Sequence, residues 1–453
     1  MHLLFRAKNY VPHRWEWLLF LSTVLMLAAS APASVLGGEE VWADPGDYRQ
    51  AVRTLRAGDV LRLRPGVYRQ GLTLHGMVGE DGDPIEIRGP LAGDPAVFVG
   101  RPGVNTVSIM DSAHVVIGNL VLDGQGLEVD GVKAEGHANW AHHITLENLV
   151  IRGHDASQQT VGISTKCPAW DWIIRGNTIV EAGTGIYLGD SDGSAPFVGG
   201  LIEYNSVRDT IGYNLQIKHQ LARPEVAGFP REDRETVIRH NVFGKERGVS
   251  QTKHPRPNVL VGHFPPEGAG SDDRYLIYGN FFYENSTERL FQGEGNLALY
   301  DNIFINDRGD AVSIQPHKGE LKRVWMFHNT VLASGGGILV TSSPGTEERR
   351  IVANAVFAAE PLRGSGGEPN HTGGRHDAGD YFRVPTGTLG DLDLRPKAGE
   401  NTALHLRFTQ LADAGCDYRG RPRGRQYAGA LVPGGERPRL GLGRKPAVQC
   451  TSP

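Results

Sequence analysis

The same short motif recurs along most of this 453-residue chain: an apolar residue, two variable residues, an asparagine, and a Val, Phe or similar residue two positions later. Successive copies are 22 to 39 residues apart, and each interval holds short runs of alternating apolar and polar residues. A strand-rich unit repeated at this period predicts a solenoid, because one unit cannot bury its apolar side alone, whereas units stacked about 4.8 Å apart can. The nine asparagines are Asn119, Asn148, Asn177, Asn205, Asn241, Asn280, Asn302, Asn329 and Asn354.

Asparagine suits a tight turn because it tolerates unusual backbone angles, and its amide offers both a donor and an acceptor to a stacked copy. At these nine positions the chain resembles the right-handed parallel β-helix proteins of the pectin-lyase-like superfamily, in which such asparagines form a ladder. The resemblance implies an all-β fold, a single-stranded right-handed parallel β-helix of about ten coils. It extends to exported bacterial β-helix proteins and, more weakly, to alginate and chondroitin lyases.

The N-terminus reads as a targeting segment. Three basic residues precede an apolar run at 17–31, and small residues follow at 31–33. This pattern predicts a secretory signal over 1–33 and a secreted or periplasmic protein. The run is shorter than a membrane span of about 20 residues, so we expect no stable membrane span after cleavage, with an uncleaved anchor as the alternative.

The remainder is expected to be one β-helix domain over 41–432, opened by a helical cap. Asp44 and Pro45 suit a helix start, and apolar residues then follow at helical spacing up to Leu55. Such a helix would cover the open edge of the first coil. Residues 433–453 are rich in Pro, Gly and Arg, and we expect them to form a loose tail.

Charge and cysteine content exclude some classes of protein. The net charge is −4, so no attraction to nucleic acid is implied. Export permits a Cys416–Cys450 bond that would hold the tail, which leaves Cys167 as a buried thiol. No Cys/His pattern has zinc spacing. We name no required cofactor, keep Ca²⁺ as the candidate ion, and expect a monomer.

The two longest intervals between asparagines are neighbours, and they carry the expected site. Their extra residues, 219–235 and 251–274, are loops of a length that is usually functional. We expect both loops to wall a groove on the outer face of one sheet, where strand alternation places Gln216 and Lys218. Basic side chains beside carboxylates suit an acidic polysaccharide. The expected substrate-binding residues are Gln216, His219, Lys253, Glu267, Arg289, Gln292, Glu294, His317 and Lys318.

The favoured chemistry is β-elimination, or C5-epimerisation, of a uronate. Both require neutralisation of the carboxylate and a base that removes the C5 proton. In the lyases that the chain resembles, a lysine on this sheet is the base and an arginine about one coil later assists. The resemblance therefore implies Lys218 as base, assisted by Arg256, His254 or His263. The Asp-Pro-His-Asp motif of bacterial mannuronan epimerases is missing.

Two other functions fit the same residues. The protein could bind polysaccharide or envelope partners without catalysis, through the same groove. It could also be a glycoside hydrolase, for which Asp190 and Asp192 in GDSDG offer paired carboxylates. A turn capped by aspartates, or a Ca²⁺ site, explains that Gly-Asp segment equally well.

Overall fold

The computed structural model describes residues 38–247, 254–317, 319–341, 348–364, 369–397, 410–423 and 427–450. Residues 38–453 form one compact unit, and the account below concerns that unit alone. The predicted secretory signal lies outside the described residues. Within them, no helix has the length and apolar character needed to cross a membrane.

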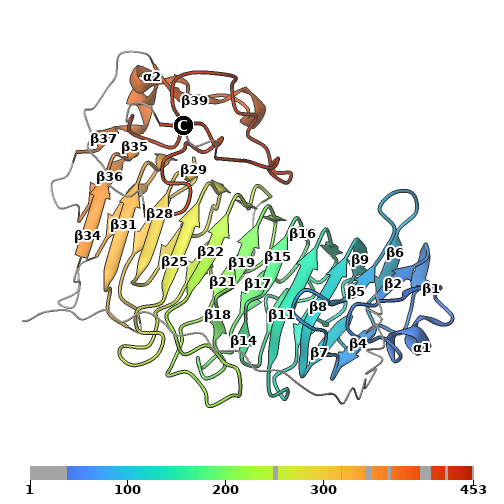
Figure 1. The fold of residues 1–453 in the computed structure, drawn as a ribbon. Coiled ribbons are helices and arrows are strands. Elements are labelled where there is room, and N and C mark those ends of the chain that lie inside the picture. Colours follow the sequence, from blue (N-terminus) through green and yellow to red (C-terminus); the bar gives the residue numbers. More distant parts are fainter. Residues whose placement is uncertain are drawn as a thin grey trace, which may run out of the picture. The chain divides into compact units, whose positions relative to one another are not determined.

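Three sheets of parallel strands make up the unit, and the chain visits them in rotation (Figure 1). We call them sheets 1, 2 and 3 in the order of this rotation. Each strand pairs with its counterpart in the coil before and the coil after. The chain is therefore a right-handed parallel β-helix, as the resemblance at the asparagine positions implies.

Sheet 1 has 14 strands over the described residues. They are β1 (Glu40–Ala43), β2 (Val60–Leu63), β5 (Ile85–Arg88), β8 (Ser112–Gly118), β11 (Ala141–Glu147), β14 (Ala169–Trp170), β15 (Ile173–Arg175), β18 (Phe197–Val198), β19 (Leu201–Glu203), β22 (Glu235–Arg239), β25 (Arg274–Tyr278), β28 (Leu297–Tyr300), β31 (Arg323–Phe327) and β34 (Glu348–Val352).

Sheet 2 follows the asparagine turn and has 12 strands in the described part of the chain. They are β3 (Gly66–Tyr68), β6 (Ala96–Val99), β9 (Leu120–Asp123), β12 (Val150–Arg152), β16 (Thr178–Val180), β20 (Ser206–Arg208), β23 (Val242–Gly244), β26 (Phe281–Tyr283), β29 (Ile303–Asn306), β32 (Thr330–Ala333), β35 (Ala355–Phe357) and β37 (His371–Gly373).

Sheet 3 has 11 strands among the residues described. They are β4 (Leu72–His75), β7 (Val107–Met110), β10 (Val132–Ala134), β13 (Val161–Thr165), β17 (Thr184–Leu188), β21 (Leu215–Ile217), β24 (Val259–Val261), β27 (Phe291–Gly293), β30 (Val312–Ile314), β33 (Gly336–Val340) and β36 (Glu360–Arg363). The stack is therefore slightly longer than the ten coils expected.

Helices are short. They are α1 (Tyr48–Val52), α2 (Ala378–Tyr381) and the 3₁₀ turns η1 (Arg375–Asp377) and η2 (Leu389–Asp391). Helix α1 lies within the stretch expected to be helical and buries Tyr48 and Val52, but its role as a cap stays a prediction. Beyond the last coil, β38 (Phe382–Val384) pairs antiparallel with β39 (Asp393–Pro396).

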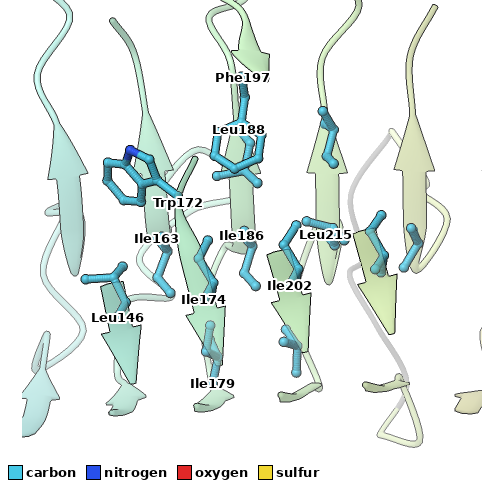
Figure 2. Close-up of a cluster of buried hydrophobic side chains, with 14 of the residues drawn as sticks. Leu146, Ile163, Trp172, Ile174, Ile179, Ile186, Leu188, Phe197, Ile202 and Leu215 are labelled. Carbon is cyan, nitrogen blue, oxygen red and sulfur yellow. The ribbon is translucent and has the colours of Figure 1, made fainter. Parts of the chain in front are cut away.

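The core fills the space between the three sheets (Figure 2). Inward residues repeat from coil to coil at the same register, as Ile163, Ile186 and Leu215 do on sheet 3. All three are fully buried. Alternation along each strand then points the intervening residues outward, which gives the outer faces their polar side chains.

The asparagine ladder runs from Asn177 to Asn370 at the turn between sheets 1 and 2. Each ladder amide donates to the Oδ1 of the next, for example Asn205 to Asn241 at 2.9 Å. Each also donates to a carbonyl of the preceding coil, as Asn241 does to Ile202 at 2.8 Å. The ladder ends one step later than expected, because Asn354 donates to Asn370 at 2.9 Å.

Asn119 and Asn148 do not belong to the ladder, contrary to expectation. Both have positive φ, 60° and 54°, and the register aligns Asn148 with Gly176 rather than with Asn177. The buried Leu149 takes the ladder position, and its N–H donates to Asn177 Oδ1 at 2.9 Å. These two asparagines instead supply the left-handed residue of the turn, a conformation that asparagine tolerates better than most side chains.

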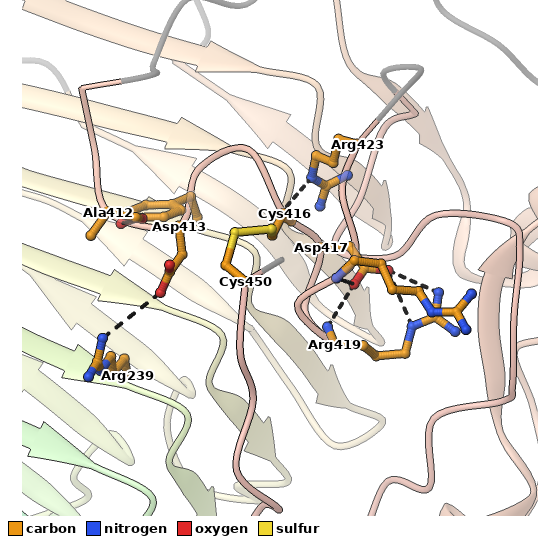
Figure 3. Close-up of a disulfide and its surroundings, with 10 residues drawn as sticks. Arg239, Ala412, Asp413, Cys416, Asp417, Arg419, Arg423 and Cys450 are labelled. Atoms are coloured by element: carbon orange, nitrogen blue, oxygen red, sulfur yellow. Dashed lines mark hydrogen bonds and ion pairs between the residues drawn. A yellow bond between two sulfur atoms is a disulfide. The ribbon is translucent and has the colours of Figure 1, made fainter. Parts of the chain in front are cut away.

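The C-terminal segment 434–450 is packed against the coils, whereas a loose tail was expected. Cys416 and Cys450 form a disulfide, as the sequence allowed, with a Cα–Cα distance of 5.7 Å (Figure 3). Lys445 Nζ donates to the carbonyl of Gly279 at 3.0 Å, and Ser206 Oγ donates to that of Leu442 at 2.6 Å. The segment is held by hydrogen bonds between polar side chains and backbone groups rather than by a long apolar run. Composition alone does not reveal such hydrogen bonds.

Candidate functional site

A polar pocket of about 490 Å³ lies on the outer face of sheet 3, over the coils that contain β10, β13, β17 and β21. Its charged lining consists of four cations, Lys133, Lys166, Lys218 and Arg256, and two carboxylates, Glu128 and Asp130. The two aromatic side chains in the lining are Tyr187 and Tyr213. The surplus of positive charge favours an anionic ligand.

Strand register explains how the floor of the pocket forms. Lys133 pairs with Ser164, Ser164 with Tyr187, and Tyr187 with Gln216. These residues stack in one outward column of sheet 3, between columns that face the core. Three of them, Lys133, Tyr187 and Gln216, line the pocket, whereas Ser164 is fully buried in the same column.

Two lysines lie in a second column, just beyond the strand ends. Lys166 follows β13 and Lys218 follows β21, and the register places Gly189 of the intervening coil between them. Gly189 has φ of 86°, and a Cβ there would lie 3.3 Å from the Lys218 Cβ. The glycine permits the left-handed turn and leaves room between the lysines.

Lys166 lies in an environment that favours its neutral form. Its Nζ lies 3.3 Å from the centre of the Tyr187 ring. Burial, opposed by Asp130 and reinforced by Lys133, lowers the pKa of the Lys166 ammonium to about 8. A neutral amine, which can accept a proton, is therefore accessible near physiological pH.

The pocket tyrosines can donate hydrogen bonds to a ligand, whereas the carboxylate of Asp130 is already held by its neighbours. Burial raises the pKa of Tyr187 and of Tyr213, so both hydroxyls stay protonated and can donate. Tyr213 also lies beneath Arg256, whose guanidinium carbon is 5.6 Å from the ring centre. Asp130 is fixed: it accepts from the Val161 N–H at 2.9 Å and lies 3.4 Å from Lys133 Nζ.

Three of the residues named from sequence meet in this pocket: Gln216, Lys218 and Arg256. His254 lies beside it, exposed, with its carbonyl accepting from the lining residue Gln158 at 3.2 Å. Gln292 belongs to the outward column of Gln216 but lies two coils further along.

The other expected site residues do not line the pocket. His219 and His263 are buried, with rings 5.3 Å apart, and each bonds a backbone carbonyl. Arg289 pairs with Glu288 at 2.8 Å, and Glu294 is buried. Glu267 and His317 are exposed. Lys253 and Lys318 lie outside the described residues.

The long loops do not wall the pocket as expected; in their described parts they contribute Arg256, with Lys218 just before the first loop. Arg223 of the first loop and Asp273 of the second form a buried ion pair at 2.6 Å, which ties the loops to each other. The walls come instead from the shorter turns at 128–130 and 158–160. Loop length indicates an insertion but not the direction in which it folds.

Sequence reasoning missed Lys166, Tyr187 as a lining residue, and the acidic wall at Glu128 and Asp130. A signal for Lys166 exists, because it follows a strand of sheet 3 just as Lys218 does. Asp190 and Asp192 cap their own turn, where Asp190 accepts from the Gly193 and Ala195 N–H groups at 3.0 Å. This outcome agrees with the turn interpretation.

No protein-family model matches this chain, and no curated protein matches it either. Among solved structures, an alginate lyase from Paenibacillus sp. str. FPU-7 shares 14% identity over 74% of this chain and 97% of its own, with a TM-score of 0.40. The A-module of the Azotobacter vinelandii mannuronan C-5 epimerase AlgE4 shares 14% over 73% and 90%, with a TM-score of 0.40. A GH136 lacto-N-biosidase from Eubacterium ramulus shares 11% over 74% and 68%, with a TM-score of 0.36. At such scores nothing about activity follows.

Proposed function

We propose that this protein acts on a uronate-containing polysaccharide in the sheet 3 pocket, as a lyase or a C5-epimerase. The observation that carries the proposal is the placement of Lys166, with a pKa lowered to about 8, among Lys133, Lys218 and Arg256. A proton acceptor surrounded by fixed cations is what removal of a proton next to a carboxylate requires.

In this proposal, Lys218 and Arg256 bind the uronate carboxylate and neutralise it. The neutral Lys166 amine takes the C5 proton, and the electron pair left on C5 is delocalised into the carboxylate. In a lyase that pair then forms the C4–C5 double bond as the C4–O4 bond breaks, and O4 takes a proton from Tyr187 or Tyr213. In an epimerase, C5 instead regains a proton on its opposite face.

The carboxylates favour a binding role over glycoside hydrolysis. Asp130 is held by the Val161 N–H and by Lys133, so it is not placed as a mobile acid or nucleophile. Glu128 and Asp130 are instead suited to accept hydrogen bonds from sugar hydroxyls. Non-catalytic binding of an acidic polymer is the competing function, and the experiment below separates the two.

The test is to incubate the purified protein with alginate, pectate, chondroitin and heparin-like polymers, with and without Ca²⁺. A lyase gives a rise in the ultraviolet absorbance of unsaturated uronates, and an epimerase gives deuterium incorporation at C5 in D₂O by NMR. Lys166→Ala should abolish either signal, and Lys397→Ala, an exposed lysine outside the pocket, should leave it unchanged. Binding without either signal on any polymer would overturn the catalytic proposal.

We also propose that the chain is exported. The signal-like segment at 1–33 and the Cys416–Cys450 disulfide support this, since disulfides persist in oxidising compartments. N-terminal sequencing of the protein from the periplasmic fraction or medium would show the cleaved end, and a full-length cytoplasmic product would contradict it.

A further inference from the structure

Three histidines gather on the outer face of sheet 1, on a different sheet from the pocket. They are His114 of β8 and the consecutive pair His142 and His143 of β11. Each offers a ring nitrogen, and these nitrogens all lie within 4.8 Å of one another. No other such group of His, Cys, Asp or Glu occurs in the described residues.

A local distortion of the strands creates the cluster. Ala141 and Ile144 are buried, but His142 and His143 between them both face outward, which a regular strand would not allow. His143 has φ of 52°, and so does His114, which the register places opposite it in the coil before. Asp171, opposite His143 in the next coil, has φ of 54°. Left-handed residues of this kind carry a strain that is often associated with function.

The surroundings hold each ring in place. His142 stacks on Trp170 with ring centres 4.2 Å apart, and Trp140 lies 4.9 Å away. His143 stacks on His114 at 4.4 Å. The Trp170 ring packs in turn against Phe229 of the first long loop at 5.1 Å. Side chains fixed by packing lose little entropy when they bind a ligand.

The two nitrogens of His143 face different partners. Its Nδ1 lies 2.8 Å from the Nδ1 of His142. Its Nε2 lies 3.6 Å from the Asp171 carboxylate, and Asp171 is in turn paired with Arg234. A carboxylate near the outer nitrogen favours the tautomer with its proton on Nε2, which leaves Nδ1 able to bind a cation. This is how carboxylates orient histidines that bind metals.

We propose that His114, His142 and His143 form a binding site for a divalent transition-metal ion, with Asp171 positioning His143. Imidazole nitrogens are ligands that suit Zn²⁺, Cu²⁺ or Ni²⁺, whereas Ca²⁺ prefers oxygen ligands. Binding needs the proton between the two Nδ1 atoms to move to an outer ring nitrogen. It also needs the two rings to move apart slightly, because Nδ1 atoms 2.8 Å apart are closer than two ligands of one ion. The ion would also link two adjacent coils. The proposal is independent of the proposed uronate chemistry.

The competing explanation is a hydrogen bond between two neutral imidazoles, with one Nδ1–H donating to the other Nδ1. The test is calorimetric titration of Zn²⁺ into the chelator-treated full chain, followed by Co²⁺ absorption spectroscopy. We expect one ion per chain and a visible Co²⁺ band typical of nitrogen ligands. His143→Ala should weaken binding by on the order of 100-fold, and Asp171→Asn by about 10–100-fold.

His376→Ala is the matched control, since its side chain is 88% exposed in a different part of the chain, and it should leave binding unchanged. Asp171→Asn keeps the three histidines, so it tests the site even if a histidine variant fails to fold. Absence of stoichiometric binding to the wild-type chain would overturn the proposal. So would binding that both His143→Ala and Asp171→Asn leave unchanged.

Discussion

Lys166 shows how the pocket sets the chemistry of a single side chain. Burial and Lys133 favour the neutral amine, whereas Asp130 favours the ammonium, and burial is the larger effect. The Tyr187 ring centre lies 3.3 Å from the Nζ, and its π electrons attract an ammonium group less strongly than a carboxylate would. The result is a lysine whose protonation state changes near pH 8 instead of above pH 10.

This pKa predicts how activity depends on pH. A base must be deprotonated, so kcat/KM should rise with pH, about tenfold per unit, and level off above pH about 8. Asp130→Asn removes a charge that raises the pKa of Lys166, so the plateau should begin at lower pH. The measurement is the kcat/KM profile of both proteins on the polymer they convert.

Glu128→Gln is the control for this pH profile, because Glu128 lines the pocket but is not among the charges that shift the pKa of Lys166. It should keep the wild-type profile. A profile that stays in place in Asp130→Asn would show that a group other than Lys166 limits the rate at low pH.

The asparagine ladder is the element that fixes the register of neighbouring coils. Asn241 is fully buried, accepts from the N–H and the amide of Asn205 at 2.9 Å each, and donates to the Ile202 carbonyl and to Asn280. Four bonds of one side chain thus join three coils. Its loss leaves several buried polar groups without partners, which is costly because no water reaches them.

Asn241→Ala should lower the free energy of unfolding by roughly 2–5 kcal/mol. Asn119→Gly, at a position with φ of 60° outside the ladder, should change it by less than about 1 kcal/mol, since glycine adopts that conformation readily. Urea unfolding followed by circular dichroism measures both. Similar losses in the two variants would contradict the assignment of ladder and turn positions.

At the scale of the whole molecule, the C-terminal segment fastens several coils together. Arg444 bonds the carbonyl of Gly176, Tyr204 receives the Val448 N–H at 3.1 Å, and Lys445 reaches Gly279. The disulfide closes this segment onto Cys416, whose carbonyl accepts from Arg423 Nε at 3.1 Å (Figure 3). Arg423 also forms an ion pair with Asp301. The segment thereby crosses the turns of coils that are far apart in sequence.

Opening the disulfide should release this segment. The bond spans 34 residues, so Cys450→Ser should lower the free energy of unfolding by about 4 kcal/mol. Under native conditions, reduction should expose 434–450 to trypsin and Cys450 to alkylation, both read by mass spectrometry. The buried Cys167, whose pKa is raised to about 12, should stay unmodified. A segment that resists trypsin after reduction would show that its side-chain contacts suffice.

The repeat pattern of the amino-acid sequence is enough to predict the coil architecture. Seven of the nine asparagines, from Asn177 to Asn354, form the ladder, because a buried stacking amide leaves a strict local pattern of apolar neighbours. Strand alternation also placed Gln216 on the outer face of sheet 3, where it lines the pocket, since alternation along a strand is a local property. It also allowed the Cys416–Cys450 bond.

Which side chains meet depends on the way the coils stack, and this is visible in the folded chain alone. Asn148 lies one residue before the ladder position of its coil. The sequence motif around Asn148 resembles the motif around a ladder asparagine, so the motif alone does not reveal this difference. Lys166 and Lys218 are 52 positions apart in the sequence but lie in the same column two coils apart, with Gly189 between them. His114, His142 and His143 meet because two coils share one backbone distortion. Such contacts depend on the exact register of each coil and on the direction in which its loops fold, and the pattern of one sequence specifies neither.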